Sequence, residues 1–110
     1  MVLGTTLLKG DGAAYSSPSF PRGSMVGSFR VQAMHKWGTS PTFDVDVEHR
    51  NAEDTAFTSA GTFTQITATG SHTLTVSGLK EIVRLKYTAG GTEVYAGWHF
   101  LVLAPQWLPE

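Results

Sequence analysis

The sequence predicts a single all-β domain, an antiparallel β-sandwich of jelly-roll type, with a flattened β-barrel as the alternative. The chain has 110 residues, which is the size of one domain. Apolar and polar residues alternate with a period of two over several segments, as half-buried strands require. No window long enough for a helix shows a helical period. About six to eight short strands separated by turn residues are typical of sandwiches and barrels.

The alternation predicts strands at residues 28–37, 42–50, 73–77, 81–88 and 93–103, and a Thr-rich stretch at 55–69 that Gly61 breaks. In the first of these strands, strict alternation places His35 and Trp37 on the inward face together with the apolar residues. Gly90 and Gly91 predict a hairpin turn between the last two strands, because both can adopt a positive φ. The expected core is therefore built from the central part of the chain.

The two ends of the chain differ from its centre in composition. The N-terminal stretch is rich in Gly, Pro and Ser, which disfavours both helix and regular strand, and Tyr15 and Phe20 are its aromatic anchors. The C-terminus carries Trp107 and Leu108 beside Pro105. We therefore expect three parts, namely an extended arm at residues 1–24, the sandwich at 25–103 and an extended tail at 104–110.

The last predicted strand is apolar on both faces, so both faces must be covered. The arm, the tail or another subunit could provide this cover. Trp107 outside the predicted strands is either clamped on its own domain or inserted into a partner, since buried Trp residues dominate interfaces. The side chains that we expect at a partner interface are Tyr15, Phe20, Tyr95, Leu101, Leu103, Trp107 and Leu108.

Composition and charge argue against several partner classes. The net charge is −1, the pI is near 6.4 and the eight Lys and Arg residues are scattered. Nucleic-acid binders and polybasic membrane-binding segments instead concentrate positive charge, so we expect neither nucleic acid nor membrane as a partner. Charged residues make up 15% of the chain, below the usual share of about 25%. This suggests that neighbouring subunits cover part of the surface, or that uncharged Thr, Ser and Gly form it.

The chain has no cysteine, which excludes disulfides and thiolate ligands. The N-terminus lacks the features of a signal peptide, and no apolar run approaches the length of a membrane span. We therefore expect synthesis in the cytoplasm.

A row of carboxylates, Asp44, Asp46 and Glu48, lies on one face of the second predicted strand. Such a row could supply oxygen ligands to Ca²⁺, but the Gly-containing loop of a calcium site is missing. We expect instead a solvated face, or pairing with Arg84 and Lys86 across the sheet or across a subunit interface.

The remaining patterns do not predict catalysis or a cofactor. No two of the four histidines have the i, i+2 or i, i+4 spacing of a strand or helix zinc site. His35 and His49 could meet at one end of the core. No serine-nucleophile elbow and no phosphate-binding glycine loop occurs. We expect no catalytic residue, no metal site and no cofactor.

Four segments resemble small virion structural proteins of tailed phages, namely Phe43–Arg50, Gly61–Ile66, Gly78–Tyr87 and Phe100–Trp107. The resemblance is one of style, a Thr- and Gly-rich sandwich with an arm and a Pro/Trp tail. It implies a non-enzymatic capsid decoration or cement-type subunit, made in the host cytoplasm and located in the virion. Its implied partners are the major capsid protein and further copies of itself, with a trimer favoured, and its arm and tail would dock on the shell.

The alternative function is a carbohydrate-binding jelly roll, located on a phage fibre or tail. An exposed pair among Trp37, Tyr87, Tyr95 and Trp98 would then stack on a sugar. The segment around Arg84 also resembles the arginine-bearing strand of discoidin-like jelly rolls, which bind sugars or lipids.

Overall fold

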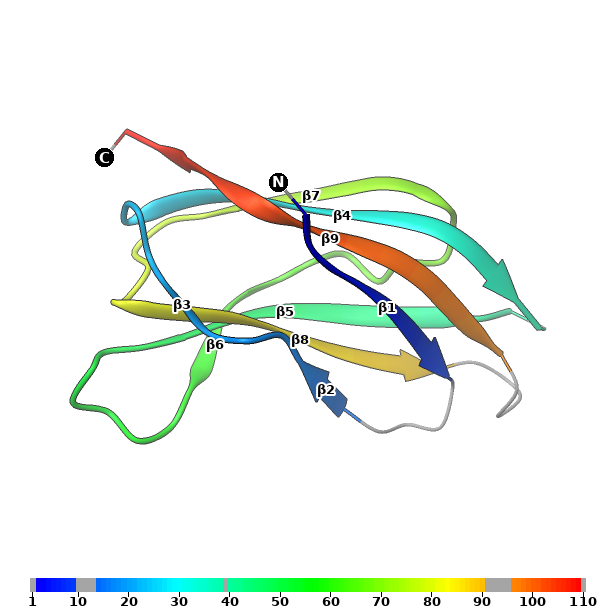
Figure 1. Ribbon diagram of the computed structural model, residues 1–110, viewed down its shortest axis with the longest axis horizontal. Coiled ribbons are helices and arrows are strands. Elements are labelled where there is room, and N and C mark those ends of the chain that lie inside the picture. Colours follow the sequence, from blue (N-terminus) through cyan, green and yellow to red (C-terminus); the bar gives the residue numbers. More distant parts are fainter. Residues whose placement is uncertain (1, 10–13, 39, 91–95, 110) are drawn as a thin grey trace.

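The computed structural model describes residues 2–9, 14–38, 40–90 and 96–109, with residues 2–9 and 14 described through their backbone alone. These residues form two antiparallel sheets packed face to face, with no helix among them (Figure 1). The strands are β1 (Val2–Lys9), β2 (Ala14–Ser16), β3 (Phe20–Pro21), β4 (Val26–Trp37), β5 (Thr42–Arg50), β6 (Thr58–Thr62), β7 (Gly70–Val76), β8 (Ile82–Gly90) and β9 (Gly97–Leu108). The predicted all-β sandwich is confirmed.

The strand order is that of a jelly roll. One sheet has the order β1-β9-β4-β7, the other has the order β2-β8-β5-β6, and β3 pairs with β8 beside β2. The first strand therefore lies next to the last one, and the chain changes layer after every strand except β2 and β5, which are followed by β3 and β6 in the same sheet. When β2 and β3, which both pair with β8, are counted as one interrupted edge strand, this is the arrangement of an eight-stranded, two-sheet jelly roll.

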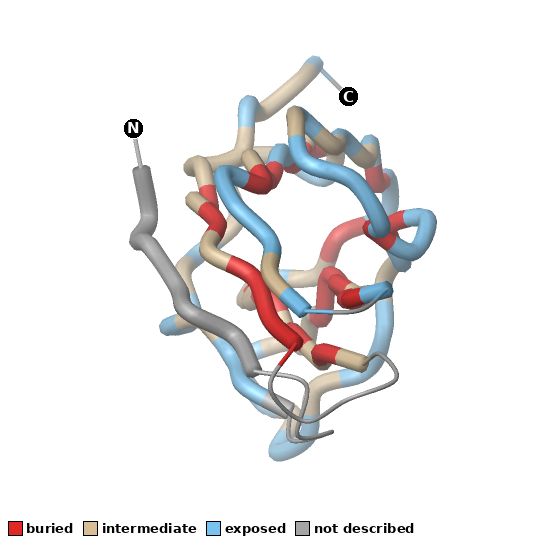
Figure 2. Tube along the Cα trace, turned by 90° about the vertical axis from the view of Figure 1, so that its right-hand side faces the viewer, coloured by how far each residue is buried: buried red, intermediate tan, exposed pale blue. Residues whose placement is uncertain are grey.

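The core fills the space between the sheets, chiefly with alternate residues of β4, β5, β8 and β9 (Figure 2). At its centre the Phe43 ring stacks on Phe100 with a centroid distance of 4.8 Å, and Trp98 and Tyr87 pack around this pair. Aromatic contacts of this kind add about 0.5–1.5 kcal/mol each to the free energy gained by burial.

The expected N-terminal arm forms strands of the sandwich. β1 pairs with β9 from Val2 opposite Leu103 to Lys9 opposite Gly97, and β2 and β3 pair with β8. Ser17 fastens the segment between them, because its N–H donates to the Leu85 carbonyl at 2.8 Å and its Oγ accepts from the Leu85 N–H at 2.9 Å. The boundary expected at residue 24 therefore falls inside one folded unit.

The expected tail is also part of a sheet, because β9 continues to Leu108. A bulge explains how the strand passes Pro105. Arg30 pairs with Leu103 and Ser28 pairs with Gln106, so two residues of β9, Ala104 and Pro105, lie opposite the single residue between them on β4. Proline is tolerated in a strand at such a bulge, where its missing N–H breaks no ladder bond.

A second bulge corrects the expected positions of His35 and Trp37. Ala33 pairs with Phe100 and His35 pairs with His99, which leaves Met34 as an extra residue on β4. One extra residue exchanges the two faces of a strand. His35 is therefore exposed on the outer face instead of lying inward, and it does not meet His49, which belongs to the opposite sheet.

The expected hairpin at Gly90 and Gly91 is wrong, although Gly91 itself lies outside the described residues. β8 and β9 belong to different sheets and do not pair with each other. The chain therefore crosses between the layers at this point instead of turning back within one sheet.

Candidate functional site

Two of the residues expected at a partner interface complete the chain's own core. The partly buried Trp107 ring lies 6.4 Å from the Phe20 ring and 6.3 Å from the Phe29 ring, both in edge-to-face contact. Gly27 lies opposite Trp107 in the ladder and Gly23 lies beside the ring, where a Cβ atom would come within 2.5 Å of it. Of the two positions expected for Trp107, the structure shows the clamp on its own domain.

The other expected interface residues have different environments. Leu101 and Leu103 lie partly exposed on the outer face of the four-stranded sheet, while Tyr15 on β2 is 45% exposed. Leu108 is partly buried, and its carbonyl accepts a hydrogen bond of 2.6 Å from Ser24 Oγ. Tyr95 lies outside the described residues.

The expected carboxylate row is used within the chain. Glu48 Oε1 accepts from Arg84 Nε at 2.8 Å, and the two residues are opposite each other in the ladder between β5 and β8. The Arg84 guanidinium also lies 4.0 Å from the centroid of the Phe57 ring. Of the two pairings expected for this row, across the sheet or across a subunit interface, Glu48 and Arg84 form the one across the sheet.

The other two carboxylates accept hydrogen bonds from neutral side chains. Thr62 Oγ1 donates to Asp46 at 2.7 Å, and Gln65 Nε2 donates to Asp44 at 3.3 Å. Lys86 lies opposite Asp46 in the ladder. This face of β5 is thus hydrogen-bonded to the residues that follow it in the chain.

The aromatic platform expected for sugar stacking does not form from the described members of its set. Tyr87 is 4% exposed and Trp98 is fully buried. Burial raises the pKa of the Tyr87 hydroxyl to about 12, against a smaller opposing effect of a hydrogen bond with Ser17. Trp37 is partly exposed, and its ring stacks on His35 at 6.1 Å instead of on a second large aromatic residue.

His49 has a structural partner. Its Nδ1 accepts a hydrogen bond of 3.2 Å from the Lys80 N–H, which places the proton of the neutral ring on Nε2. Burial lowers the pKa of His49, and the positive charge of Lys80 lowers it further. The ring is therefore held neutral to support the turn that precedes β8.

The sheet edges are not equally protected. β2 has only three residues, β1 has an irregularity near Gly4 and ends on Lys9, and β6 has an irregularity where it pairs with Val47 and Glu48. Short edges, lysines and bulges all discourage edge-to-edge pairing. β7 has seven residues, Gly-Ser-His-Thr-Leu-Thr-Val, with no Lys, Arg, Asp, Glu or Pro and no irregularity in its pairing with β4.

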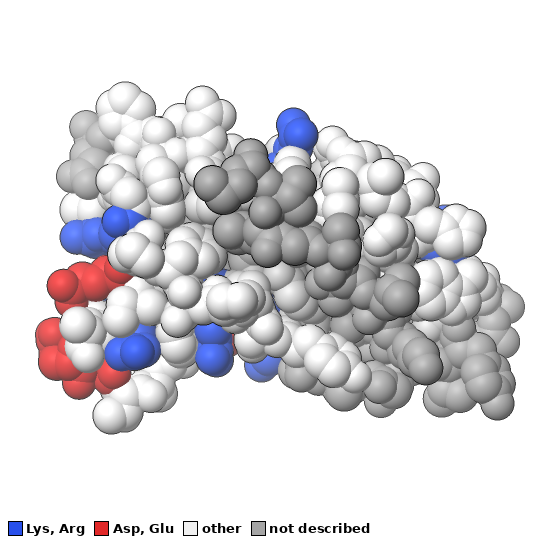
Figure 3. All heavy atoms as spheres, viewed as in Figure 1, with Lys and Arg blue, Asp and Glu red and all other residues white. Residues whose placement is uncertain are grey.

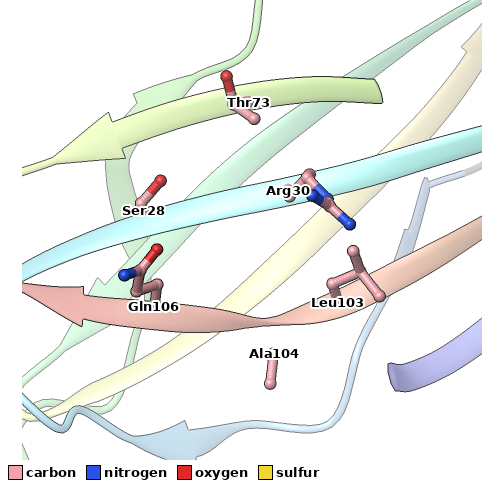
Figure 4. Close-up of a pocket in the computed structure, with 6 residues that line it drawn as sticks. All are labelled: Ser28, Arg30, Thr73, Leu103, Ala104 and Gln106. Carbon is pink, nitrogen blue, oxygen red and sulfur yellow. The ribbon is translucent and has the colours of Figure 1, made fainter. Parts of the chain in front are cut away.

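A hollow of about 370 Å³ opens on the outer face of the four-stranded sheet, across β7, β4 and β9. We call it the Arg30 hollow, and its lining consists of Ser28, Arg30, Thr73, Leu103, Ala104 and Gln106 (Figure 4). Ser28 and Gln106 lie side by side on neighbouring strands, and the Arg30 guanidinium extends toward β9. Apart from Leu103, none of these residues was expected at a binding site, although Pro105 inside an apolar strand signals the bulge that shapes the hollow.

Charge is distributed unequally between the two layers. The four strands β1, β9, β4 and β7 contain no Asp or Glu, whereas β5 alone contains three acidic residues. On the face shown in Figure 3, the acidic side chains gather at one end of the molecule. The sheet that carries the Arg30 hollow is thus the positively biased one.

Metal-binding clusters and membrane-spanning helices are both absent from the described part of the chain. In that part, no cluster of three or more His, Asp and Glu residues could hold a metal ion. No helix there has the length and hydropathy needed to cross a membrane. No protein-family model, no curated protein and no solved structure matches the chain.

Proposed function

We propose that this chain is a non-enzymatic structural subunit of a tailed-phage virion, a capsid decoration or cement-type protein that works through protein–protein contacts. The observation that carries the proposal is the unprotected edge of β7. Among the described residues, the backbone of residues 71–76 hydrogen-bonds only to β4, so the groups along the other side of the strand have no protein partner.

An open edge of this kind is suited to strand addition. A neighbouring strand gains main-chain hydrogen bonds along the whole edge, and alternate side chains supply specificity. Natural proteins usually blunt an edge of this length, and the other edges of this sandwich carry such features. The exception at β7 favours a partner strand at that position.

The virion setting rests on the resemblance of the sequence to phage structural proteins. The jelly roll agrees with this setting, because viral capsid proteins use the fold, although lectins and cupins use it too. Fold alone does not decide function, so the edge and the sequence style carry the argument together. The proposed partner contact is therefore made by the β7 edge and not by Trp107 and Phe20, which pack inside the domain.

The type of contact determines the size of the assembly. Antiparallel pairing of β7 with β7 of a second copy is isologous and closes at a dimer. The trimer that we favour needs a heterologous contact, in which β7 of one copy meets a different surface of the next copy. The molecular mass in solution distinguishes the two arrangements.

The test compares Thr75→Lys with Thr64→Lys by light scattering after size-exclusion chromatography. Both threonines are exposed, but Thr75 lies on β7 and Thr64 follows β6 in an irregular segment. We expect the wild type and Thr64→Lys to elute with the mass of three chains and Thr75→Lys to elute as a folded monomer. A monomeric wild type, or an unchanged assembly in Thr75→Lys, would refute the proposal.

A further inference from the structure

The Arg30 hollow has the features of a small binding site and is built by a specific irregularity of the fold. The extra residue of the bulge at Ala104 and Pro105 puts Leu103 and Gln106 on the same face of β9. Both side chains therefore line the hollow, opposite Ser28 and Arg30. Bulges re-aim side chains and are frequent next to functional sites. The volume of about 370 Å³ lies at the lower end of the range for small-molecule pockets.

The charge of the hollow selects a ligand with one anionic group. Arg30 is exposed and, among the described residues, its guanidinium forms no ion pair or hydrogen bond. The four strands of its sheet contain no carboxylate that could neutralise it. A planar guanidinium binds a carboxylate through two parallel hydrogen bonds, and this arrangement is available at Arg30.

The rest of the lining matches a hydroxylated ring. Ser28, Thr73 and Gln106 offer neutral donors and acceptors, and in the described chain none of these side chains is hydrogen-bonded to another group. Leu103 and Ala104 add an apolar surface between them. A pyranose presents hydroxyls at its rim and C–H groups on its face, so one sugar unit uses both kinds of lining.

We propose that the Arg30 hollow binds a saccharide unit that carries a carboxylate, a uronic-acid type of sugar. Arg30 pairs with the carboxylate, the three polar side chains bind ring hydroxyls, and Leu103 contacts the ring face. This activity goes beyond assembly of the particle, because it gives the subunit an affinity for acidic polysaccharide.

The test is a titration of the ¹⁵N-labelled full chain, followed by the backbone amide signals in ¹H–¹⁵N NMR spectra. The probes are sodium glucuronate, glucose and sodium acetate, since glucuronate combines the ring of glucose with the carboxylate of acetate. We expect saturable shifts at Ser28, Arg30, Thr73 and Gln106 with glucuronate, and at least tenfold weaker binding of the other two probes. Added salt should weaken glucuronate binding, because the site is open to solvent.

Two variants with the same change in charge complete the design. Arg30→Gln should weaken glucuronate binding at least tenfold, whereas Lys86→Gln, on the opposite sheet, should leave binding unchanged. Binding of glucose as tight as that of glucuronate would overturn the role of the carboxylate, and equal binding of acetate would overturn the role of the ring. An absence of shifts, or unchanged binding by Arg30→Gln, would overturn the proposal as a whole. The titration does not depend on self-association, so its failure is distinguishable from failure of the assembly model.

Discussion

Replacement of Trp107 by alanine tests whether the C-terminal end of the chain stabilises the domain. The ring is partly buried against Phe20 and Phe29. Removing a fully buried Trp lowers the free energy of unfolding by about 3–5 kcal/mol. Because Trp107 is partly exposed, we expect a smaller loss of roughly 2–3 kcal/mol. For a domain of this size, such a loss lowers the melting temperature by roughly 10–20 °C.

The assay is urea unfolding followed by far-UV circular dichroism, which does not depend on the fluorescence of the removed Trp. Gln106→Ala is the matched control, because the neighbouring residue is exposed and its loss should change the free energy of unfolding by less than about 0.5 kcal/mol. If Trp107→Ala also stayed within that limit, the ring would not clamp the domain. Its expected role as an anchor in a partner would then return.

Three further predictions follow from individual contacts. Gly23→Ala should cost about 1–3 kcal/mol, because the new Cβ would meet the Trp107 ring; in a Trp107→Ala background this cost should largely vanish, and an additive double mutant would contradict the contact. The lowered pKa of His49 means that the unfolded chain binds a proton more readily below about pH 6.5, so stability should fall as the pH drops through that value. His49→Asn should reduce this dependence in urea unfolding and exposed His35→Asn should not; equal slopes would exclude the mechanism. The pKa of Tyr87 near 12 means that stability falls as the pH rises above about 10, where unfolded tyrosine ionises; the ultraviolet phenolate titration should lose its highest step in Tyr87→Phe, and an unchanged curve would contradict the burial effect.

Period-two patterns in the sequence were sufficient to place the core strands. Phe29, Val31, Phe43, Val45 and Val47 alternate without interruption and are buried as expected. Each of their strands has one solvent-facing side, so the pattern alone determines which side points inward.

The pattern failed where one residue is added. The bulge at Met34 turns His35 outward, and the bulge at Ala104 and Pro105 turns Trp107 inward. Without the bulge at Ala104 and Pro105, Trp107 would share the outer face with Leu101 and Leu103. A bulge leaves little trace in single-residue propensities, and only Pro105 signalled it.

The N-terminal edge strands β1, β2 and β3 were missed for a different reason. β1 pairs with a strand almost the whole chain length away, from Val2 opposite Leu103. The Gly, Pro and Ser content of the segment from residue 9 to residue 24 correctly indicated a poor central strand. It could not show that short stretches, such as β2 and β3, are held at an edge by β8.

The most direct test of the virion assignment is quantitative mass spectrometry of purified phage particles from the source that encodes the chain. We predict copies in near-stoichiometric ratio to the major shell protein, as expected for a decoration subunit that covers the capsid. A handful of copies per particle would contradict head decoration and place the subunit in a tail or fibre. Its absence from the particles would contradict the virion assignment itself.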